Sequence, residues 1–327
     1  MSGPPAAVAA VRVAVRRDLD DVAAGDLVLV ACSGGADSLA LLAATAFEAP
    51  RSGLRFGAVT VDHAWSVGSA ERAQRVVDVA RRLGAEPAVA VRAPAERTED
   101  AARSARYAVL HATADEFDAA VILLAHSLDD QAETVLLRLA RGSGARSLAG
   151  MPARRGRYRR PLLGIRRDVL HEAAAAEGLQ PWHDPANEDR AFARARVRHD
   201  IIDVLESALG PGVTESLARS AELLSADADA LDLWTKAVDP GGSAADVTAL
   251  CRLPLAVRSR VVRAMALRSG VEPGALTSAH IESVDRLLSD WHGQGPVALP
   301  GGVSAVRRCG RLGFAPTEMT AGSEGES

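Results

Sequence analysis

The sequence predicts an α/β fold in which a mostly parallel sheet is followed by a smaller, mostly helical domain. Four short apolar segments alternate with helical patterns through the first 140 residues. This order is typical of a parallel sheet with helices on both faces. Beyond residue 210 helical patterns dominate, and strand-like segments return only near the C-terminus. The 327 residues suffice for two such domains, which we place at 1–212 and 213–327.

The elements of the first domain follow from apolar periodicity and turn residues. Strands are expected at 27–32, 56–61, 88–91 and 119–125, and helices at 12–22, 39–47, 69–83, 98–117 and 128–140. Residues 142–160 are rich in Gly and Arg and are expected to form a flexible loop. A helix at 166–177, an irregular turn at 181–187 and a helix at 191–209 complete the domain.

The second domain shows three further helical patterns and a short β-rich end. The helices are expected at 214–236, 254–269 and 276–290. Two or three short strands are expected within 297–314, around a Pro-Gly-Gly turn. Residues 317–327 are polar and are expected to be disordered.

The motif that follows the first strand, Ser33-Gly34-Gly35-Ala36-Asp37-Ser38, predicts a phosphate site. Adjacent glycines allow backbone angles that other residues avoid, so that successive N–H groups can face one anion at the start of a helix. The only lysine is Lys236, which excludes the commoner loop that ends in Gly-Lys-Ser or Gly-Lys-Thr. Asp37 is expected to hold a metal ion that accompanies the phosphates. An ordinary Gly turn is the alternative.

A second polar segment follows the fourth strand, from His126 to Thr134. Asp130 and Glu133 share one face of the expected helix. Two such carboxylates can hold an ammonium group, bind magnesium or accept a proton, although an acidic first turn also complements the helix dipole. Asp62-His63 ends the second strand. All three polar clusters therefore fall at the carboxyl ends of strands, where sheets of this class bind ligands.

The charge of the chain is unevenly distributed. Residues 138–199 contain fourteen arginines and six acidic residues, an excess of eight positive charges, although the whole chain carries −4. Such a segment predicts a surface for a polyanion. A general preference for Arg over Lys explains the missing lysines but not this clustering.

Cysteine content and hydropathy narrow the class of protein. The three cysteines, Cys32, Cys251 and Cys309, are widely spaced, so we expect no disulfide framework and no zinc site. The N-terminal residues lack a continuous apolar stretch, and no apolar run approaches the length of a membrane span. We expect a cytoplasmic protein without a membrane partner. The sequence leaves the oligomeric state open, with a homodimer as one option.

Several segments, taken in order, resemble the tRNA(Ile)-lysidine synthetase family of the ATP-pyrophosphatase, or PP-loop, superfamily. They are Ser33–Ser38, Val61–His63, Leu124–Met151, Arg160–Leu163, Trp182–Asn187 and Phe192–His199, and Leu299–Gly302 is similar to a later part of the family. The resemblance covers essentially all of residues 25–200. It implies that the parallel-sheet domain has the adenine nucleotide alpha hydrolase-like fold of PP-loop ATPases.

The resemblance also implies an activity. Members join free L-lysine to C2 of the cytidine at the first anticodon position of an isoleucine tRNA with a CAU anticodon. ATP first adenylates the tRNA and releases pyrophosphate, with Mg²⁺ as cofactor. The lysine side-chain amine then displaces AMP to give lysidine.

The resemblance and the motifs together predict the roles of particular residues. The ATP site is expected to comprise Ser33, Gly34, Gly35, Ala36, Asp37, Ser38, Asp62 and His63. Catalysis is assigned to Asp37, Asp130 and Glu133, metal binding to Asp37 and Asp130, and lysine binding to Asp130, Glu133 and Arg198. Contacts with tRNA are assigned to Arg141, Arg154, Arg155, Arg157 and Arg194, supported by the C-terminal domain.

Five residues at three places depart from the family pattern. Ala64-Trp65-Ser66 replaces a common Gly-Leu-Arg, Ala195 replaces an Asn, and Ser127 replaces a second His. Trp65 either stacks on a base or packs within its loop. The alternatives to a lysidine synthetase are a PP-loop tRNA thiolase, which needs reactive cysteines or an iron–sulfur cluster, and a non-catalytic nucleotide- or RNA-binding relative.

Overall fold

The computed structural model describes residues 3–63, 68–94, 98–184 and 188–317. It divides into two compact units, one up to Ser225 and one from Ala226 onward. The division falls within helix α10 (Val213–Val238), whereas the boundary proposed from the sequence lies at the start of that helix.

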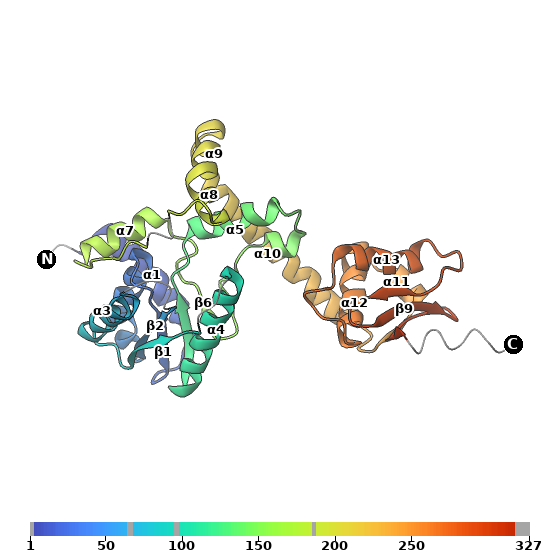
Figure 1. Cartoon of the computed structure of the whole chain (residues 1–327), viewed down its shortest axis with the longest axis horizontal. Helices are drawn as coiled ribbons and strands as arrows, with labels where there is room; N and C mark the ends of the chain where they lie inside the picture. The colour runs from blue at the N-terminus through green and yellow to red at the C-terminus, as the bar shows by residue number, and fades with distance from the viewer. Residues whose placement is uncertain (1–2, 64–67, 95–97, 185–187, 318–327) are drawn as a thin grey trace. The chain divides into compact units, whose positions relative to one another are not determined.

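The first unit contains a mostly parallel sheet, as the sequence predicts (Figure 1). Its strands lie in the order β3-β2-β1-β4-β6-β5. All neighbouring pairs are parallel except β5 and β6, which form an antiparallel edge. The strands are β1 (Leu27–Ala31), β2 (Arg55–Asp62), β3 (Ala88–Arg92), β4 (Ala119–Leu124), β5 (Arg154–Arg155) and β6 (Tyr158–Arg159).

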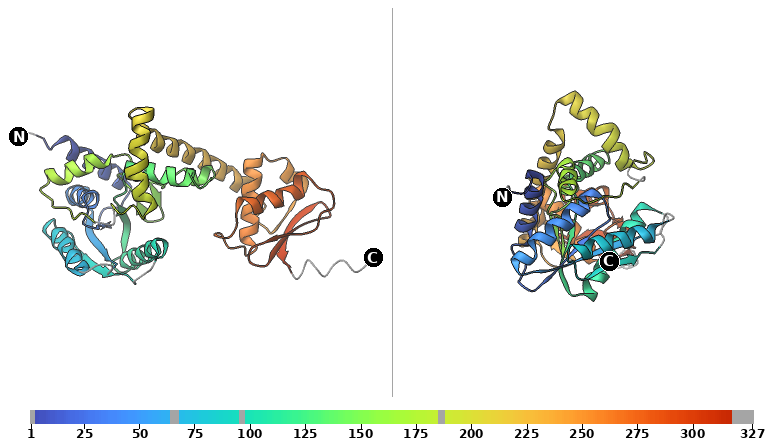
Figure 2. Two further views of the ribbon diagram at one scale, coloured as in Figure 1. Left: turned by 45° about the horizontal axis from the view of Figure 1, so that its top comes forward. Right: turned by 90° about the vertical axis from the view of Figure 1, so that its left-hand side faces the viewer.

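Helices cover both faces of this sheet (Figures 1 and 2), because alternate residues of β1 serve two cores. Val28 and Val30 belong to a core with apolar residues of α1, α2, α3 and α7, whereas Leu27 and Leu29 belong to a core with Leu110 and Ala114 of α4. The helices are α1 (Ala6–Leu19), α2 (Ala36–Glu48), α3 (Ser69–Arg82), α4 (Glu99–Glu116), α5 (Leu128–Leu139) and α7 (Arg167–Ala176), with a 3₁₀ turn η1 at Pro50–Ser52.

The prediction of a flexible loop at 142–160 is wrong. The segment forms helix α6 (Ala145–Leu148) and the β5–β6 hairpin, whose second strand pairs with Ile122 and Leu123 of β4. The side-chain amide of Gln131 also fixes Met151, because it donates to the Met151 carbonyl (3.1 Å) and accepts from the Met151 N–H (2.7 Å). Strands of two residues are too short to show alternating hydrophobicity, so the Gly and Arg content misled the prediction.

The helix predicted at 191–209 contains an irregular turn. Helix α8 (Ala193–Arg196) leads into a π-helical turn, η3 (Val197–Ile201), and then into α9 (Ile202–Leu209). Turns with i→i+5 hydrogen bonds are rare in proteins and are frequent at functional sites.

The second unit has a four-stranded antiparallel sheet in the order β7-β10-β9-β8 and one apolar core (Figure 1). The predicted helices and terminal strands are present, whereas β7 and α11 were not predicted. The elements are β7 (Ala244–Asp246), α11 (Val247–Cys251), α12 (Leu255–Arg268), α13 (Ser278–Ser289), β8 (Val297–Leu299), β9 (Val303–Arg308) and β10 (Arg311–Pro316).

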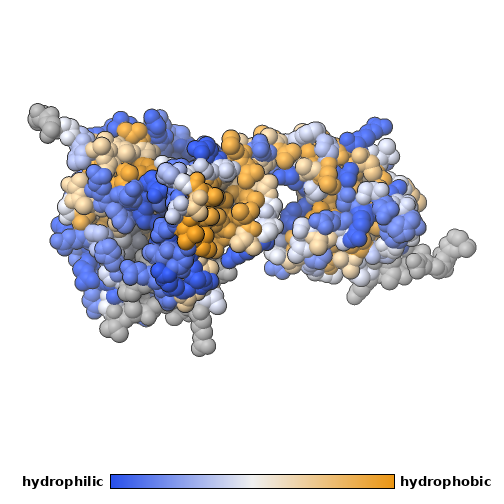
Figure 3. All heavy atoms as spheres, turned by 90° about the horizontal axis from the view of Figure 1, so that it is seen from above, coloured by the Kyte–Doolittle hydropathy of each residue, from blue (hydrophilic) through white to orange (hydrophobic). Residues whose placement is uncertain are grey.

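The surface is hydrophilic over most of the face in Figure 3, with apolar areas between the charged ones. The large exposed apolar side chains include Ile201, Val204 and Leu209, at and beyond the π-helical turn. None of the helices in the described part of the chain is long and apolar enough to cross a membrane.

Candidate active site

The order of the strands places two polar segments side by side. The chain runs outward from β1 through β2 to β3, and then returns to β4 on the other side of β1. Sheets of this class bind ligands at such a switch point, beyond the carboxyl ends of the two central strands. The Ser33–Ser38 loop follows β1, and the segment from His126 to Asp130 follows β4. The site therefore forms where two distant motifs of the sequence meet.

The Ser33–Ser38 loop is held by its own side chains and by one distant backbone group. The hydroxyl of Ser38 accepts the Gly34 N–H (3.1 Å) and donates to the Gly35 carbonyl (2.9 Å). The Trp182 N–H donates to the Gly34 carbonyl (2.9 Å). Gly35 is the N-cap residue of α2 and has no side chain to cap the helix. The first N–H groups of α2 are thus left for an anion, as a phosphate site requires.

Gly34 and Gly35 provide a matched pair for testing this loop. Gly34 has φ +87°, and a Cβ atom there would lie 2.8 Å from Val76 Cγ2, whereas a Cβ atom on Gly35 would meet nothing closer than 3.8 Å. We expect Gly34→Ala to reduce stability by about 1–3 kcal/mol, because a left-handed non-glycine residue is strained, and to weaken ATP binding. Gly35→Ala should leave the melting temperature unchanged. Equal melting temperatures for the two variants would contradict the conformation of the loop.

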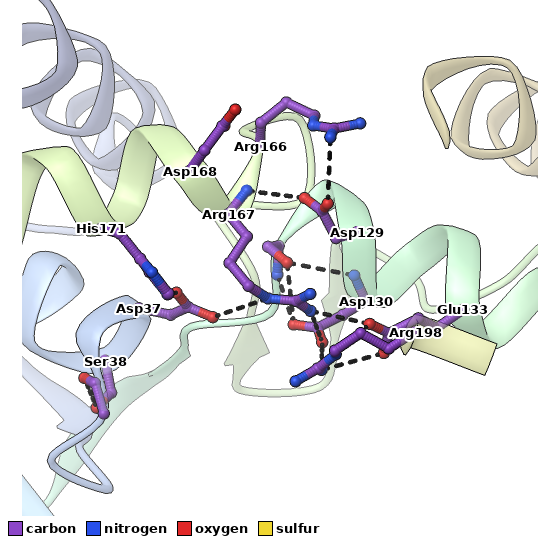
Figure 4. Close-up of polar contacts among 12 residues, drawn as sticks. Asp37, Ser38, Asp129, Asp130, Glu133, Arg166, Arg167, Asp168, His171 and Arg198 are labelled. Atoms are coloured by element: carbon purple, nitrogen blue, oxygen red, sulfur yellow. Dashed lines mark hydrogen bonds and ion pairs between the residues drawn. The ribbon is translucent and has the colours of Figure 1, made fainter. Parts of the chain in front are cut away.

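Asp37 lies in the first turn of α2. The negative charge of its carboxylate is only partly balanced by neighbouring basic groups. Its Oδ1 atom is buried and accepts no hydrogen bond from the residues that the structure describes. The nearest basic groups are His171, whose Nε2 atom lies 3.4 Å from Oδ1, and Arg167, whose Nε atom lies 3.9 Å from Oδ2 (Figure 4). Burial raises the pKa of Asp37 to about 7, although Arg167 opposes the shift. A divalent cation shared with phosphate oxygens would supply the missing charge, so this carboxylate fits Mg²⁺.

Protein side chains alone do not enclose a metal ion in the part of the chain that the structure describes. No group of three or more His, Cys, Asp and Glu side chains there has a suitable arrangement. This composition fits Mg²⁺, which keeps several waters and binds through one or two carboxylates together with substrate phosphates.

The second motif forms a cluster of carboxylates and guanidinium groups at the start of α5. Ser127 and Asp130 cap the helix reciprocally: the Asp130 N–H donates to the Ser127 hydroxyl (3.2 Å), and the Ser127 N–H donates to Asp130 Oδ2 (2.9 Å). One turn later Glu133 is completely buried. Because burial of a carboxylate is costly without partners, Glu133 requires the cations that surround it.

Three arginines supply those cations. Arg194 Nε lies 3.0 Å from Glu133 Oε2, Arg198 Nε lies 2.8 Å from Glu133 Oε1, and Arg167 Nη2 lies 3.0 Å from the same Oε1. Arg194 and Arg198 are four residues apart, in α8 and η3, so they project from one face toward α5. Figure 4 shows Arg167 and Arg198 converging on this carboxylate.

Asp130 belongs to the same cluster and remains ionised. Its Oδ1 atom lies 2.9 Å from Arg167 Nη2 and 3.5 Å from Arg198 Nη2. Burial acts to raise the pKa of Asp130, but Arg167, Arg194 and the Ser127 N–H together hold it below the ordinary value. An ionised, partly covered carboxylate beside a buried one can bind and orient a cationic substrate.

Residues 12–205 match the family model of the PP-loop domain, and residues 246–312 match that of the TilS substrate binding domain. A tRNA(Ile)-lysidine synthase of Thermobifida fusca is 56% identical over 319 residues, which cover 95% of this chain and 98% of that protein. Another from Salinispora arenicola is 51% identical over 322 residues, covering 94% and 96%.

The chain belongs to the tRNA(Ile)-lysidine synthase family. This confirms the resemblance that the motifs indicated. A solved structure of the U34-tRNA thiolase NcsA from Methanococcus maripaludis, with its [4Fe-4S] cluster, shares the fold at a TM-score of 0.57. It is 20% identical and covers 67% of this chain and 79% of that chain. The rival thiolase assignment has less support, because the lysidine synthase relatives match nearly the whole chain.

The lysidine synthase fold brings together most of the residues that the motifs assigned to catalysis, metal and lysine. Asp37, Asp130 and Glu133 are linked through Arg167, and Arg198 contacts both carboxylates of α5. Asp62 and His63 end β2, where Arg106 of α4 donates to His63 Nε2 (3.3 Å) and burial lowers the pKa of His63. Trp65 lies outside the described residues.

The arginines assigned to tRNA lie in different surroundings. Arg194 donates to Glu133 and to the Thr134 hydroxyl (2.8 Å), so it is part of the carboxylate cluster. Arg154 pairs with Asp18 and Asp21, and Arg157 pairs with Asp115. Arg141 and Arg155 are exposed.

The fold also accounts for most of the positive charge of residues 138–199. Their arginines form ion pairs with acidic residues from outside the segment, namely Asp18, Asp21, Asp37, Asp115, Asp129, Asp130, Glu133, Asp200 and Glu215. Ion pairs within the fold therefore neutralise much of the excess positive charge of this segment. The cationic surface left for a polyanion is smaller than the sequence suggested.

Sequence reasoning missed Arg167 and His171, both of α7. The Arg167 N–H donates to Asp129 Oδ2 (2.7 Å), while its guanidinium reaches Asp130 and Glu133. A signal existed: two adjacent arginines, at 166 and 167, begin a helix, where positive charge opposes the helix dipole. Such an unfavourable placement indicates a role in a site.

Proposed function

We propose that this chain catalyses the ATP-dependent ligation of free L-lysine to C2 of the cytidine at the first anticodon position of an isoleucine tRNA with a CAU anticodon. The products are lysidine, AMP and pyrophosphate, and the expected location is the cytoplasm. One observation carries the proposal: an anion loop and a pair of carboxylates that can hold an ammonium group lie at one switch point and share Arg167. The relatives named tRNA(Ile)-lysidine synthase support the substrate.

In the first half-reaction the cytosine 2-oxo group attacks the α-phosphorus of ATP. An oxygen–phosphorus bond forms, and the bond to pyrophosphate breaks. The N–H groups of the Ser33–Ser38 loop and the start of α2 stabilise the charge on the leaving pyrophosphate. Asp37 and Asp130 would hold the Mg²⁺ that screens the phosphate charges. We assign Asp62 and His63, at the end of β2, to the nucleotide as well.

In the second half-reaction the lysine side-chain amine attacks C2, and AMP leaves with the former 2-oxo oxygen. Lysine arrives as an ammonium ion with a pKa near 10.4. Asp130 and Glu133 would bind this cation and orient it, and Asp130 would accept a proton as the carbon–nitrogen bond forms. Arg198 would hold the α-carboxylate of lysine through two parallel hydrogen bonds.

The position at which ATP is cleaved tests this proposal. With Mg²⁺ and a tRNA that has C at the first anticodon position, we expect AMP and pyrophosphate as products. Without that tRNA the reaction should stop. Formation of ADP would contradict the proposal, and transfer of sulfur to the tRNA would favour the thiolase alternative.

We also propose that tRNA contacts the exposed arginines of residues 138–199, with the second unit extending the binding surface. Arg155 offers an exposed guanidinium that has no ion pair with the described residues, whereas phosphates would have to compete with acidic partners for Arg154 and Arg157.

A double variant tests this surface. Arg141→Ala with Arg155→Ala should weaken tRNA binding and reduce the salt dependence of log K by about 0.7–0.9 per lost contact. ATP binding and melting temperature should stay unchanged, because both side chains are exposed. The variant Arg154→Ala serves as the matched control and should have a smaller effect. Unchanged tRNA affinity and salt slope in the double variant would move the binding surface to the second unit.

A further inference from the structure

The guanidinium of Arg167 touches the carboxylates of both halves of the active site (Figure 4). Its Nη2 atom lies 2.9 Å from Asp130 Oδ1 and 3.0 Å from Glu133 Oε1. Its Nε atom lies 3.9 Å from Asp37 Oδ2, on the side of the phosphate loop. One cation therefore links the proposed lysine site to the proposed ATP site.

Arg167 occupies the position that the lysine ammonium group needs. The ammonium group would donate to the same two oxygen atoms, Asp130 Oδ1 and Glu133 Oε1. Arg198 already contacts both of these oxygen atoms. Each carboxylate oxygen has only about two lone-pair sites, so the ammonium group needs the sites that Arg167 fills. Lysine can take the site only after the Arg167 side chain moves.

We propose that Arg167 is a positioning residue that makes lysine binding depend on ATP. In the nucleotide-free enzyme its guanidinium fills the ammonium site. When ATP binds, the guanidinium turns toward the phosphates beside Asp37 and leaves Asp130 and Glu133 open to lysine. This inference rests on the proposed function, because it assumes that ATP and lysine are the two substrates.

The contacts of Arg167 suit such a movement. The backbone N–H of Arg167 donates to Asp129 Oδ2 (2.7 Å), so the start of α7 stays in place when the side chain turns. Its side chain has several rotatable bonds, and a guanidinium binds phosphate oxygens through two parallel hydrogen bonds. The side chain need only turn about its stem, since Asp37 belongs to the loop that would hold the phosphates.

The carboxylate cluster stays assembled when Arg167 turns away. Glu133 keeps Arg194 and Arg198, and Asp130 keeps the Ser127 N–H (2.9 Å). The lysine ammonium group then replaces one positive charge by another, so the charge balance of the cluster is restored. Binding of ATP and lysine should therefore be coupled, by a factor of about 5–150 that applies equally in both directions.

The test is calorimetric titration of the full chain with lysine, with and without a non-hydrolysable α,β-methylene analogue of ATP. In the wild type the analogue should raise lysine affinity at least about fivefold. In Arg167→Ala, lysine affinity without the analogue should rise, and the analogue should no longer increase it. Arg167→Lys keeps the cation and should keep the dependence on the analogue. Arg167→Gln provides a second neutral variant if the alanine variant folds poorly.

Arg166→Ala is the matched control, because Arg166 starts the same helix but pairs with Asp129 and Glu215. It should behave like the wild type. If both neutral Arg167 variants lower lysine affinity equally with and without the analogue, Arg167 only supports the site and the inference is wrong. The inference is also wrong if the analogue does not change the lysine affinity of the wild type. If the wild type binds no lysine even with analogue and tRNA, the proposed function itself fails.

Discussion

Replacing Asp37 by Asn should reduce tRNA-dependent release of pyrophosphate by at least about a hundredfold, the usual loss when one electrostatic stabiliser of a transition state is removed. The reason is the position of this carboxylate, in the first turn of α2 beside the phosphate loop, with a buried oxygen that accepts no hydrogen bond from the described residues. An amide has nearly the same shape but cannot balance the charge of a divalent cation. The measurement is release of labelled pyrophosphate at saturating ATP, Mg²⁺ and tRNA.

Asp168→Asn is the matched control, because Asp168 also lies in the first turn of a helix but points away from the cluster in Figure 4. Its activity should equal that of the wild type. The Asp37 variant should still bind tRNA and should melt no lower than the wild type, since burial of its charged form is unfavourable. Near-normal pyrophosphate release in Asp37→Asn would exclude this residue from the ATP and metal site.

The second large effect is expected at Glu133, because this residue both holds the cluster of arginines together and is assigned to lysine binding. Glu133→Ala leaves three guanidinium groups without their shared carboxylate. We expect a loss of up to about 3 kcal/mol in stability, because removing one partner of a buried ion pair leaves uncompensated charge. This variant alone therefore cannot separate folding from catalysis.

Glu133→Gln keeps the shape and is the better probe of lysine transfer. We expect transfer of labelled lysine to tRNA to fall at least about thirtyfold, the loss that accompanies removal of a buried charge partner. Pyrophosphate release should stay within about tenfold of the wild type, since Glu133 lies in α5, on the opposite side of Arg167 from the phosphate loop. Equal losses in both half-reactions would assign Glu133 to the scaffold alone.

The parallel sheet could be predicted from the sequence because its central strands are continuous apolar runs of five or more residues. The antiparallel edge could not, since β5 and β6 are strands of only two residues each. The π-helical turn at Val197–Ile201 was also missed. Apolar spacing over so few residues does not distinguish an i→i+5 turn from an α-helix.

The active site could be predicted where its residues are contiguous in sequence. The phosphate loop and the start of α5 each combine a strand end, a turn and charged side chains within about ten residues. Arg167 and His171 could not be placed, because their proximity to Asp37 arises from tertiary packing. Leu170 and Ala174 of α7 are buried in the core shared with α1 and α2, which directs the adjoining face of α7, with Arg167 and His171, toward Asp37.

The proposed tRNA surface shows what a sum of net charge leaves out. A sum over residues 138–199 finds eight excess positive charges but does not include the acidic residues that fold against them. Asp18 and Asp21 lie more than 130 positions away from Arg154 in the sequence, yet both pair with it. Only the fold reveals which arginines, such as Arg155, remain exposed to a polyanion.

Mass spectrometry of the anticodon fragment of isoleucine tRNA tests the central claim most directly. The chain is incubated with that tRNA, ATP, Mg²⁺ and isotopically labelled lysine, and the tRNA is then digested to fragments. The account predicts that the cytidine at the first anticodon position gains one labelled lysine with loss of water, and that Asp37→Asn abolishes this gain. A fragment of unchanged mass, or a fragment that gains sulfur, would contradict the account.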